Sequence, residues 1–373
     1  MSKLWFARTP SVAVMAAHSS LLSYQGCNFF RQRLILSTLS CRPVQITHIR
    51  SKDEEPGLRE FEVSLLKLLD KATNGTVIQL NETGTSLHFK PGLLLGGKFE
   101  HDCCTNRPIG YYLECLVALA PFCKKPLDVT LRGVTNNGTE PSVDSVKHSS
   151  FPVFGRFMFT EGLDLDIIGR GVPPLGGGEV RFRAPICRAL RPVQLLKMGK
   201  VKRVRGWAYA VRVSPAMASR VVEAAKGILL AFLPDVYIYA DHNKGKRSGN
   251  SPGFGVCLVA ETTEGAFLCA EAASQGPSVP EDVGARGARA LLREVYRGGC
   301  VDSSNQSLAC LFMALGPADV SKCLMGPLTP YTIQFLRHLR DFLDVTFKVE
   351  RQEEKVKLTC VGAGFVNLSK TTT

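Results

Sequence analysis

The sequence predicts an α+β protein whose body repeats one unit and carries a smaller inserted segment. Short β-prone runs alternate with helical patterns, and the order strand, helix, strand, strand recurs along the chain. The pattern changes near Arg188, where a basic run precedes a different succession of strands. We therefore expect a disordered extension over 1–21, a body over 22–187 and 284–373, and an insert domain over 188–283.

The first part of the body shows the recurring order. One repeat is expected to place a strand, an amphipathic helix that ends at a glycine, and two short strands at 43–50, 56–75, 76–80 and 86–92. The next is expected to place a helix, a strand, a second helix and two successive strands at 107–120, 127–133, 151–157, 161–171 and 173–182. The helix at 151–157 is predicted to be weak because it contains Pro152 and Gly155.

The insert is expected to begin with a strand that contains Trp207 and Tyr209. A helix over 215–233 and a hairpin-like pair of strands over 236–273 follow it. A loop rich in Gly, Pro and Ser ends the insert near residue 284, and a helix to Tyr296 then returns the chain to the body.

The last helix is predicted to begin at Pro330, with Thr329 as its N-cap. The helical spacing predicts an apolar face made of Ile333, Leu336, Leu339 and Leu343. The same spacing predicts a polar face made of Gln334, Arg337, His338 and Asp341. Tyr331 and His338 are seven residues apart, so both are expected to point the same way.

The composition is that of a soluble globular protein, with 373 residues of which 45% are hydrophobic and 21% charged. No apolar run approaches the length of a membrane span, and we expect no membrane association. A formal net charge of +13 indicates a polyanionic partner, with nucleic acid favoured over a membrane. The 13 cysteines form no CxxC pair, which favours buried thiols in a reducing compartment over a disulfide framework or a metal site. We expect neither a metal nor a cofactor.

Several segments taken together indicate a family. The glycine run at 176–178 alone predicts only a turn between strands, because it lacks the Lys and Ser or Thr of a phosphate-binding loop. With three other segments, in this order and spacing, it resembles the RNA 3′-terminal phosphate cyclase family, and within it the eukaryotic nucleolar branch. The four segments are LSYQGCNFFRQRLILSTLSCRPVQITHIR…PGLR, RGVTNN…PSVD, PPLGGGEV and YRGGCVDSSNQS…GPLTPYTIQFL. The resemblance covers nearly everything from Leu22 on. It implies a body of repeated units of two helices packed on a four-stranded sheet, with a smaller inserted α/β domain.

The resemblance also implies that one catalytic group has been replaced. Cyclases of this family use ATP to adenylate a histidine, transfer the adenylate to the RNA 3′-phosphate and close a 2′,3′-cyclic phosphate. By alignment, Tyr331 occupies the position of that histidine. A phenol with a pKa near 10 is a poor substitute for an imidazole that must attack and later leave. The chain is therefore expected not to cyclize RNA.

Other positions of the cyclase site differ as well. The cyclase stretch Gly-Glu-Gly-Gly-Gly-Gln reads SYQGCN at 23–28, and a glutamine that follows the Pro-Gly-Leu turn is replaced by Phe61. The degenerate site is thus expected to comprise Tyr331, Tyr24, Gln25, Asn28 and Phe61. Arg31 and Arg50 are retained, and both are expected to hold RNA phosphates.

The first functional hypothesis is an RNA-associated assembly factor without cyclase activity. The resemblance implies a role in early processing of the precursor of small-subunit (18S) rRNA, within the small-subunit processome of the nucleolus, beside a ribosome-assembly GTPase. Candidate RNA contacts in the insert are the basic residues Lys200, Lys202, Arg203 and Arg205. The alternatives for this basic run are a solvated surface or a nuclear-import signal.

The second hypothesis is an endonuclease that cuts precursor rRNA. His338 would activate the ribose 2′-hydroxyl, while Arg337 and Arg340 would stabilise the charge on the phosphorane. The alternative for this helix face is solvation or partner contact, with the stem of Arg340 packed along the apolar face. A third hypothesis, residual cyclase activity, is opposed by the joint loss of the nucleophile and the nearby acid.

Overall fold

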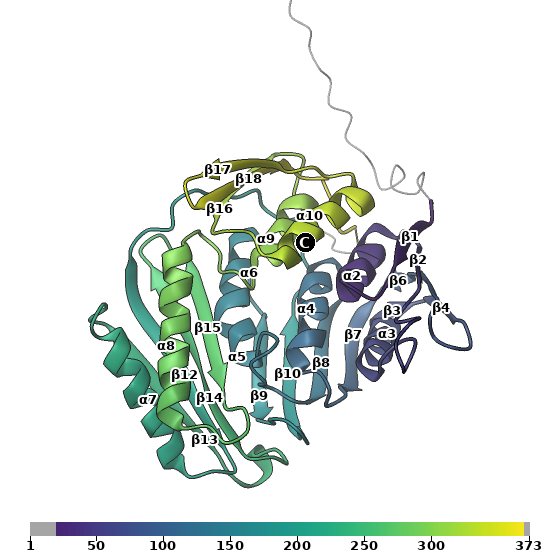
Figure 1. Cartoon of the computed structure of the whole chain (residues 1–373). Coiled ribbons are helices and arrows are strands. Elements are labelled where there is room, and N and C mark those ends of the chain that lie inside the picture. Colours follow the sequence, from purple (N-terminus) through teal and green to yellow (C-terminus); the bar gives the residue numbers. More distant parts are fainter. Residues whose placement is uncertain (1–19, 369–373) are drawn as a thin grey trace, which may run out of the picture.

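Three similar units form the body of the protein, and a fourth sheet belongs to the insert (Figure 1). The computed structural model describes residues 20–368, so the predicted disordered extension at 1–21 lies outside the described residues apart from its last two positions. In each unit an edge strand pairs in parallel with its neighbour, and the other two pairings are antiparallel. The predicted α+β body of repeated units, with two helices on a four-stranded sheet, is confirmed.

The first two units follow each other along the chain. The first consists of β1 (Leu22–Gln25), α2 (Phe30–Ser40), β2 (Val44–Thr47), α3 (Glu60–Ala72), β4 (Val77–Leu80) and β5 (Leu87–Lys90). The second consists of β7 (Gly96–Asp102), α4 (Ile109–Leu119), β8 (Lys125–Gly133), the helical run α5 (Val143–Ser145), η2 (Val146–Ser150) and α6 (Phe151–Phe157), then β9 (Asp164–Gly169) and β10 (Gly178–Ala184). Short connecting elements are β3 (Thr73–Asn74), β6 (Leu93–Leu94) and η1 (Ala120–Phe122).

The insert interrupts the third unit after that unit's first strand. The third unit consists of β11 (Gln194–Leu195), α9 (Gln306–Leu315), β16 (Val320–Met325), α10 (Pro330–Leu343), β17 (Lys348–Gln352) and β18 (Lys355–Val361). The insert consists of β12 (Val201–Val211), α7 (Pro215–Leu229), β13 (Val236–Asn243), η3 (Gly245–Arg247), β14 (Gly253–Thr262), β15 (Phe267–Ala273) and α8 (Pro280–Arg297). Its sheet has the order β13-β12-β14-β15, and α7 and α8 cover one face of it (Figure 1).

The helices of the three units meet in one central layer. Helix α10 contacts α2 and α9, and α2 contacts α4 (Figure 1). Every residue of α9 is buried, and in α4 only Glu114 is not fully buried. Helices that are apolar on all sides, as these two are, pack between other elements rather than against solvent. Arg31 of α2 and Tyr331 and His338 of α10 lie in this layer.

Some local predictions were wrong. The helix expected over 56–75 begins at Glu60 and ends at Ala72. The helix expected to be weak at 151–157 is well formed and continues from η2, a π-helical turn. Such a turn shifts the backbone pairing, so that the missing N–H of Pro152 is accommodated at the start of α6. The expected hairpin over 236–273 is β14 paired with β15, while β13 pairs in parallel with β12.

The expected end of the insert, residue 283, falls within α8. Val283, Ala288 and Leu291 of this helix belong to the same hydrophobic core as the insert strands. We therefore propose that the insert extends to Arg297.

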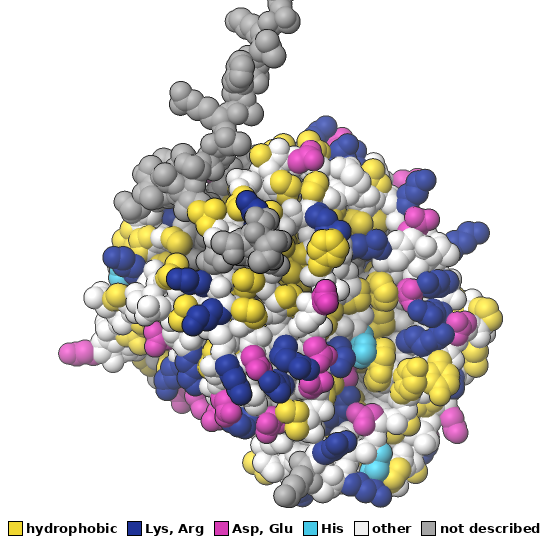
Figure 2. Space-filling view, turned by 180° about the vertical axis from the view of Figure 1, so that it is seen from behind, with side chains coloured by type: hydrophobic (Ala, Val, Ile, Leu, Met, Phe, Trp, Pro, Cys, Tyr) yellow, Lys and Arg dark blue, Asp and Glu magenta, His cyan; other side chains and the backbone are white. Residues whose placement is uncertain are grey.

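The outer face of the second sheet is covered by paired charges. Arg132 lies 2.8 Å from Glu100, Arg181 lies 2.7 Å from Asp128, and Arg183 contacts two aspartates of β9. Figure 2 shows Lys and Arg side chains mixed with Asp and Glu over the middle of this face. Opposite charges on neighbouring strands of this kind stabilise a sheet by a modest amount.

Candidate functional site

Tyr331 lies at the N-terminus of α10, where its phenol is held as a hydrogen-bond donor. Thr329 caps the helix by accepting a hydrogen bond from the backbone N–H of Thr332, as predicted. The Tyr331 hydroxyl donates to Oε1 of Glu114 over 2.6 Å. Burial is the main cause that raises the pKa of Tyr331 above its usual value, and the nearby Glu114 raises it further, against the opposing effect of Arg31. The group is therefore a neutral phenol at physiological pH.

Arg31 is the cation at the centre of this cluster. It forms an ion pair with Glu114 and a second one with Glu140 at 3.4 Å, and its guanidinium lies 4.4 Å from the centre of the Tyr111 ring. Only 7% of its surface is exposed. The two carboxylates neutralise the charge, so an RNA phosphate would have to displace one of them to reach Arg31.

The second retained arginine is similarly occupied. Both terminal nitrogens of Arg50 donate to the Glu62 carboxylate, at 2.6 and 2.8 Å, and one also donates to the carbonyl of Gly57. The hydrogen bond to Glu62 is the main cause that raises the pKa of Arg50. Two-point pairs of this kind are the strongest side-chain contacts of arginine. Arg50 therefore fixes the loop before α3 to that helix.

Tyr24 packs where β1 meets α10. Its hydroxyl donates to Asp341 over 3.3 Å, its ring stacks on Phe342, and Arg33 lies 4.6 Å from its ring centre. Burial and the charge of Asp341 raise the pKa of Tyr24 above its usual value. Tyr24, which the motif resemblance aligns with a cyclase carboxylate, thus makes a hydrophobic and a cation–π contact.

The remaining substituted positions lie around the same cluster. Gln25 and Asn28 are exposed at the end of β1 and in the turn after it. Phe61 makes an edge contact with the Tyr111 ring, with 5.5 Å between ring centres, and Arg107 lies over its other side at 4.9 Å. The structure thus brings Phe61 and Arg31 together through the shared neighbour Tyr111.

Sequence reasoning missed the acids that organise this cluster. Glu114 and Glu140 hold Arg31, and Gln32 donates to the backbone carbonyl of Tyr331 over 3.0 Å. Burial is the main cause that raises the pKa of Glu114. One signal was available: Glu114 is the only charged residue in the apolar helix sequence IGYYLECLVAL. A single acid in such a helix requires a buried partner.

Comparison with known proteins decides the family. The family model described as RNA 3′-terminal phosphate cyclase matches residues 22–349.

The chain belongs to the RNA 3′-terminal phosphate cyclase family.

Relatives within the family cover almost the whole chain. The RNA 3′-terminal phosphate cyclase-like proteins of Homo sapiens and Bos taurus are 58% and 57% identical over 371 residues, covering 96% of this chain and 100% of each relative. The rRNA processing protein rcl1 of Schizosaccharomyces pombe is 40% identical over 355 residues, covering 94% of this chain and 98% of that protein. The family resemblance expected from the motifs is confirmed.

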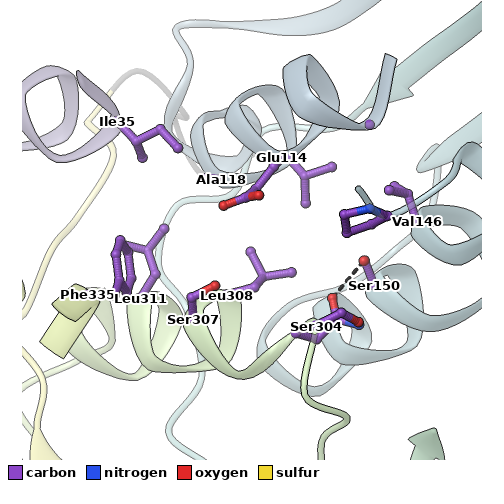
Figure 3. Close-up of a pocket in the computed structure, with 14 residues that line it drawn as sticks. Ile35, Glu114, Ala118, Val146, Ser150, Ser304, Ser307, Leu308, Leu311 and Phe335 are labelled. Carbon is purple, nitrogen blue, oxygen red and sulfur yellow. Dashed lines mark hydrogen bonds between the residues drawn. The ribbon is translucent and has the colours of Figure 1, made fainter. Parts of the chain in front are cut away.

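The cavity beside Glu114, the hydrogen-bond partner of Tyr331, is small. It lies between α2, α4, α9 and α10 and has a volume of about 40 Å³. Figure 3 shows Glu114 reaching toward it from α4, with Leu308, Leu311 and Phe335 on the opposite side. Pockets for ligands of nucleotide size usually enclose about 300 Å³ or more. This cavity has room for a few water molecules, and its walls are mostly apolar.

His338 is buried, and its predicted place on an exposed polar face of α10 is wrong. It has no exposed surface, whereas Ile333, expected on the apolar face, is 42% exposed. The buried face of the helix is formed by Thr332, Phe335, His338, Leu339, Phe342 and Leu343. Both ring nitrogens are occupied, Nδ1 by Oε1 of Gln32 at 3.0 Å and Nε2 by Gln334 at 3.1 Å.

This environment keeps His338 neutral. Burial, and to a lesser degree Arg33, lowers the pKa of His338 from 6.5 to about 4. Arg337 and Arg340 are exposed on the same helix, where Arg337 donates to Gln334 and Arg340 contacts Asp341. The two arginines are therefore accessible to a partner, while His338 reaches neither solvent nor substrate without a rearrangement of α10.

Replacing His338 by alanine is expected to lower the free energy of unfolding by about 2–4 kcal/mol at neutral pH, because a cavity forms and Gln32 loses a buried partner. Below pH 6.5 His338 binds a proton in the unfolded chain but not in the native protein, because its native pKa is about 4. The contribution of His338 to stability therefore falls as the pH drops from 6.5 toward 4. Urea unfolding between these pH values checks both points. The exposed Arg337→Ala is the matched control, and an equal change in both variants would contradict the prediction.

The predicted basic residues of the insert lie on and beside β12. Lys202 and Arg203 pair with Glu261, and Arg205 pairs with Asp235 at 2.8 Å. Lys200 is exposed just before β12. Among the described residues no helix is long and apolar enough to cross a membrane, and no group of His, Cys, Asp or Glu is arranged to hold a metal ion.

Proposed function

We propose that this protein acts in the processing of ribosomal RNA as a member of the family that does not cyclize RNA. The observation that carries the proposal is the state of Tyr331, a neutral phenol that donates to Glu114 beside the neutralised Arg31. Adenylation requires a nucleophile that can accept and release the nucleotide, and this phenol is poorly suited to either step. The name of the Schizosaccharomyces pombe relative, an rRNA processing protein, supports the biological role.

In finer detail, the protein binds the precursor of 18S rRNA in the small-subunit processome of the nucleolus, together with a ribosome-assembly GTPase. The basic charge of the chain and the exposed arginines of α10 support a role as a binding component of such an assembly. The endonuclease hypothesis needs a histidine that can accept a proton. His338, with both nitrogens occupied and a pKa of about 4, gives it no support.

The Tyr331→His variant is expected to remain inactive as a cyclase. Imidazole would restore the nucleophile, but Tyr24 and Phe61 would still occupy the positions of two other cyclase groups. Incubation with radiolabelled ATP and an RNA that ends in a 3′-phosphate should give neither an acid-labile adenylate nor a cyclic phosphate, for the wild type or the variant. A cyclic product from the wild-type protein would falsify the proposed loss of activity.

Depletion of the protein from cells tests the role in processing. Unprocessed precursor of the small-subunit RNA should accumulate while the large-subunit RNA matures, and the protein should co-purify with the processome and a GTPase. Tyr331→Phe should restore processing as well as the wild type does, because the proposed role needs no chemistry at this hydroxyl. Normal small-subunit RNA after depletion would contradict the proposed function.

A further inference from the structure

Four aromatic rings form a row that begins in the body and continues across the insert sheet, on the face that α7 and α8 do not cover. His148 of η2 stacks on Trp207 of β12, with ring centres 3.4 Å apart. Trp207 lies 6.0 Å from Tyr239, and Tyr239 lies 4.6 Å from Tyr237, both on β13. Tyr237 and Tyr239 are 52% and 47% exposed. Adjacent large aromatic side chains at the surface often mark a binding site.

The strand register explains why these rings share one face. β12 and β13 pair in parallel, so that Trp207 lies opposite Tyr239 and Arg205 lies opposite Tyr237. Side chains two residues apart on a strand point to the same side. Helices α7 and α8 cover the opposite face of the sheet (Figure 1). The body covers the part of the aromatic face formed by β14 and β15, where η2 and α5 contact β15, and it reaches Trp207 of β12 through His148. Tyr237 and Tyr239 remain about half exposed beside this contact.

Cations border the aromatic row. Arg203 precedes Arg205 by two residues on the same face of β12, and their side chains are 42% and 27% exposed. Their partners Glu261 and Asp235 form ion pairs at the surface, which contribute little to stability and can be exchanged for a phosphate. Over residues 188–297, Lys and Arg outnumber Asp and Glu by about two to one. Figure 2 shows basic side chains above a group of hydrophobic ones at the right, over the insert.

We propose that this face binds single-stranded RNA, with bases stacked on Tyr239 and Tyr237 and phosphates held by Arg205 and Arg203. Exposed rings beside cations are the combination that single strands require, because their bases present free faces while their backbone is anionic. A duplex offers no free base faces between its ends, so it would use the cations alone. The balanced charges on the outer face of the β7–β10 sheet lack this combination. The inference rests on the proposed role in RNA processing and assigns the contact to a defined surface.

The test measures binding of the full-length protein to a fluorescein-labelled oligouridylate of about 12 nucleotides, against a duplex of equal length. The Tyr237→Ala/Tyr239→Ala variant should bind the single strand about 10- to 100-fold more weakly, with an unchanged salt dependence. Tyr237→Phe/Tyr239→Phe should bind like the wild type, because phenylalanine keeps the ring. Tyr296→Ala, at an 88% exposed position of α8, is the matched control and should also bind like the wild type.

A second measurement uses the wild-type aromatic face. The chain has two tryptophans, so Trp5→Phe leaves Trp207 as the only one. Single-stranded RNA should quench its emission, and a duplex should not. Equal affinity for both RNAs, or an alanine variant that binds the single strand as the wild type does, would overturn the inference while the proposed function remains. If the alanine variant keeps its affinity for RNA but no longer binds a protein partner, the aromatic face is a protein interface. That result would also overturn the inference. A wild-type chain that binds no RNA would contradict the proposed RNA binding as well.

Discussion

Replacing Arg170 by methionine is expected to lower the free energy of unfolding by about 3–5 kcal/mol. Arg170 follows β9, and its guanidinium is nearly inaccessible. It donates to both oxygens of Asp144, at 2.6 and 2.7 Å, and through Nε to Asp241 of β13 at 2.6 Å. Asp144 is also buried, so methionine would leave a carboxylate without its countercharge between the body and the insert.

The stability lost in Arg170→Met is expected to depend on pH through the pKa of Asp144. Burial would raise this pKa, but the charge and hydrogen bonds of Arg170 outweigh burial and hold it below the usual 3.8. Because the native pKa is depressed, the stabilisation is present above pH 3.8 and is lost as the pH falls through the native value. In Arg170→Met the pKa should instead rise, so that the variant loses less stability than the wild type on acidification.

Two further variants compare this buried ion pair with an ion pair at the surface. Arg181→Met breaks a pair with Asp128 on the outer sheet face and should cost far less stability than Arg170→Met, because both side chains there are partly exposed. Arg170→Met combined with Asp144→Asn should recover part of the lost stability, because the stranded charge is removed. Urea unfolding of the four proteins checks this order. Equal losses from Arg170→Met and Arg181→Met would show that the junction does not depend on this buried charge.

The repeated fold was predictable because each unit repeats the same local patterns. Strand and helix periodicities identify β2, α3, α4, β8 and α10 within a few residues. Local sequence patterns did not predict which strand forms the edge of the sheet in the third unit. Its first strand, β11, has only two residues and pairs with β16, on the far side of the whole insert. Such a pairing leaves no periodic signal, since its energy comes from contacts distant along the chain.

Motif spacing predicts that Tyr331 stands at the position of the cyclase nucleophile, and this assignment stays a prediction. The surroundings of Tyr331 were less predictable, because its partners Glu114 and Gln32 come from other helices. His338 was misplaced because helical periodicity treats every polar residue as exposed. A polar side chain can be buried when a neighbouring element supplies its hydrogen bonds, as Gln32 of α2 does for His338.

Replacing Lys200, Lys202, Arg203 and Arg205 together by alanine is expected to reduce the salt dependence of RNA binding more than any other change of similar size. Each phosphate contact to a single strand contributes about 0.7 to the slope of log affinity against log salt, so four contacts contribute about 2.8. Between about 50 and 200 mM salt, this slope corresponds to a difference of about 50-fold in affinity. The loss should be similar for all RNA sequences, because phosphates carry no sequence information.

The control removes cations from the other side of the insert. Arg220, Arg289 and Arg293 are exposed on α7 and α8, which cover the face opposite the aromatic row. Replacing these three arginines by alanine lowers the net charge of the insert almost as much as the β12 variant does. If only long-range electrostatics mattered, both variants would change the slope of log affinity against log salt equally per cation removed. If the cations of β12 contact RNA directly, the α7/α8 control should change the salt slope less per cation removed than the β12 variant does. At salt concentrations that screen distant charges, the control should change it little. If the β12 variant keeps its affinity and slope but no longer reaches the nucleolus, the basic run is an import signal and the four cations do not hold RNA.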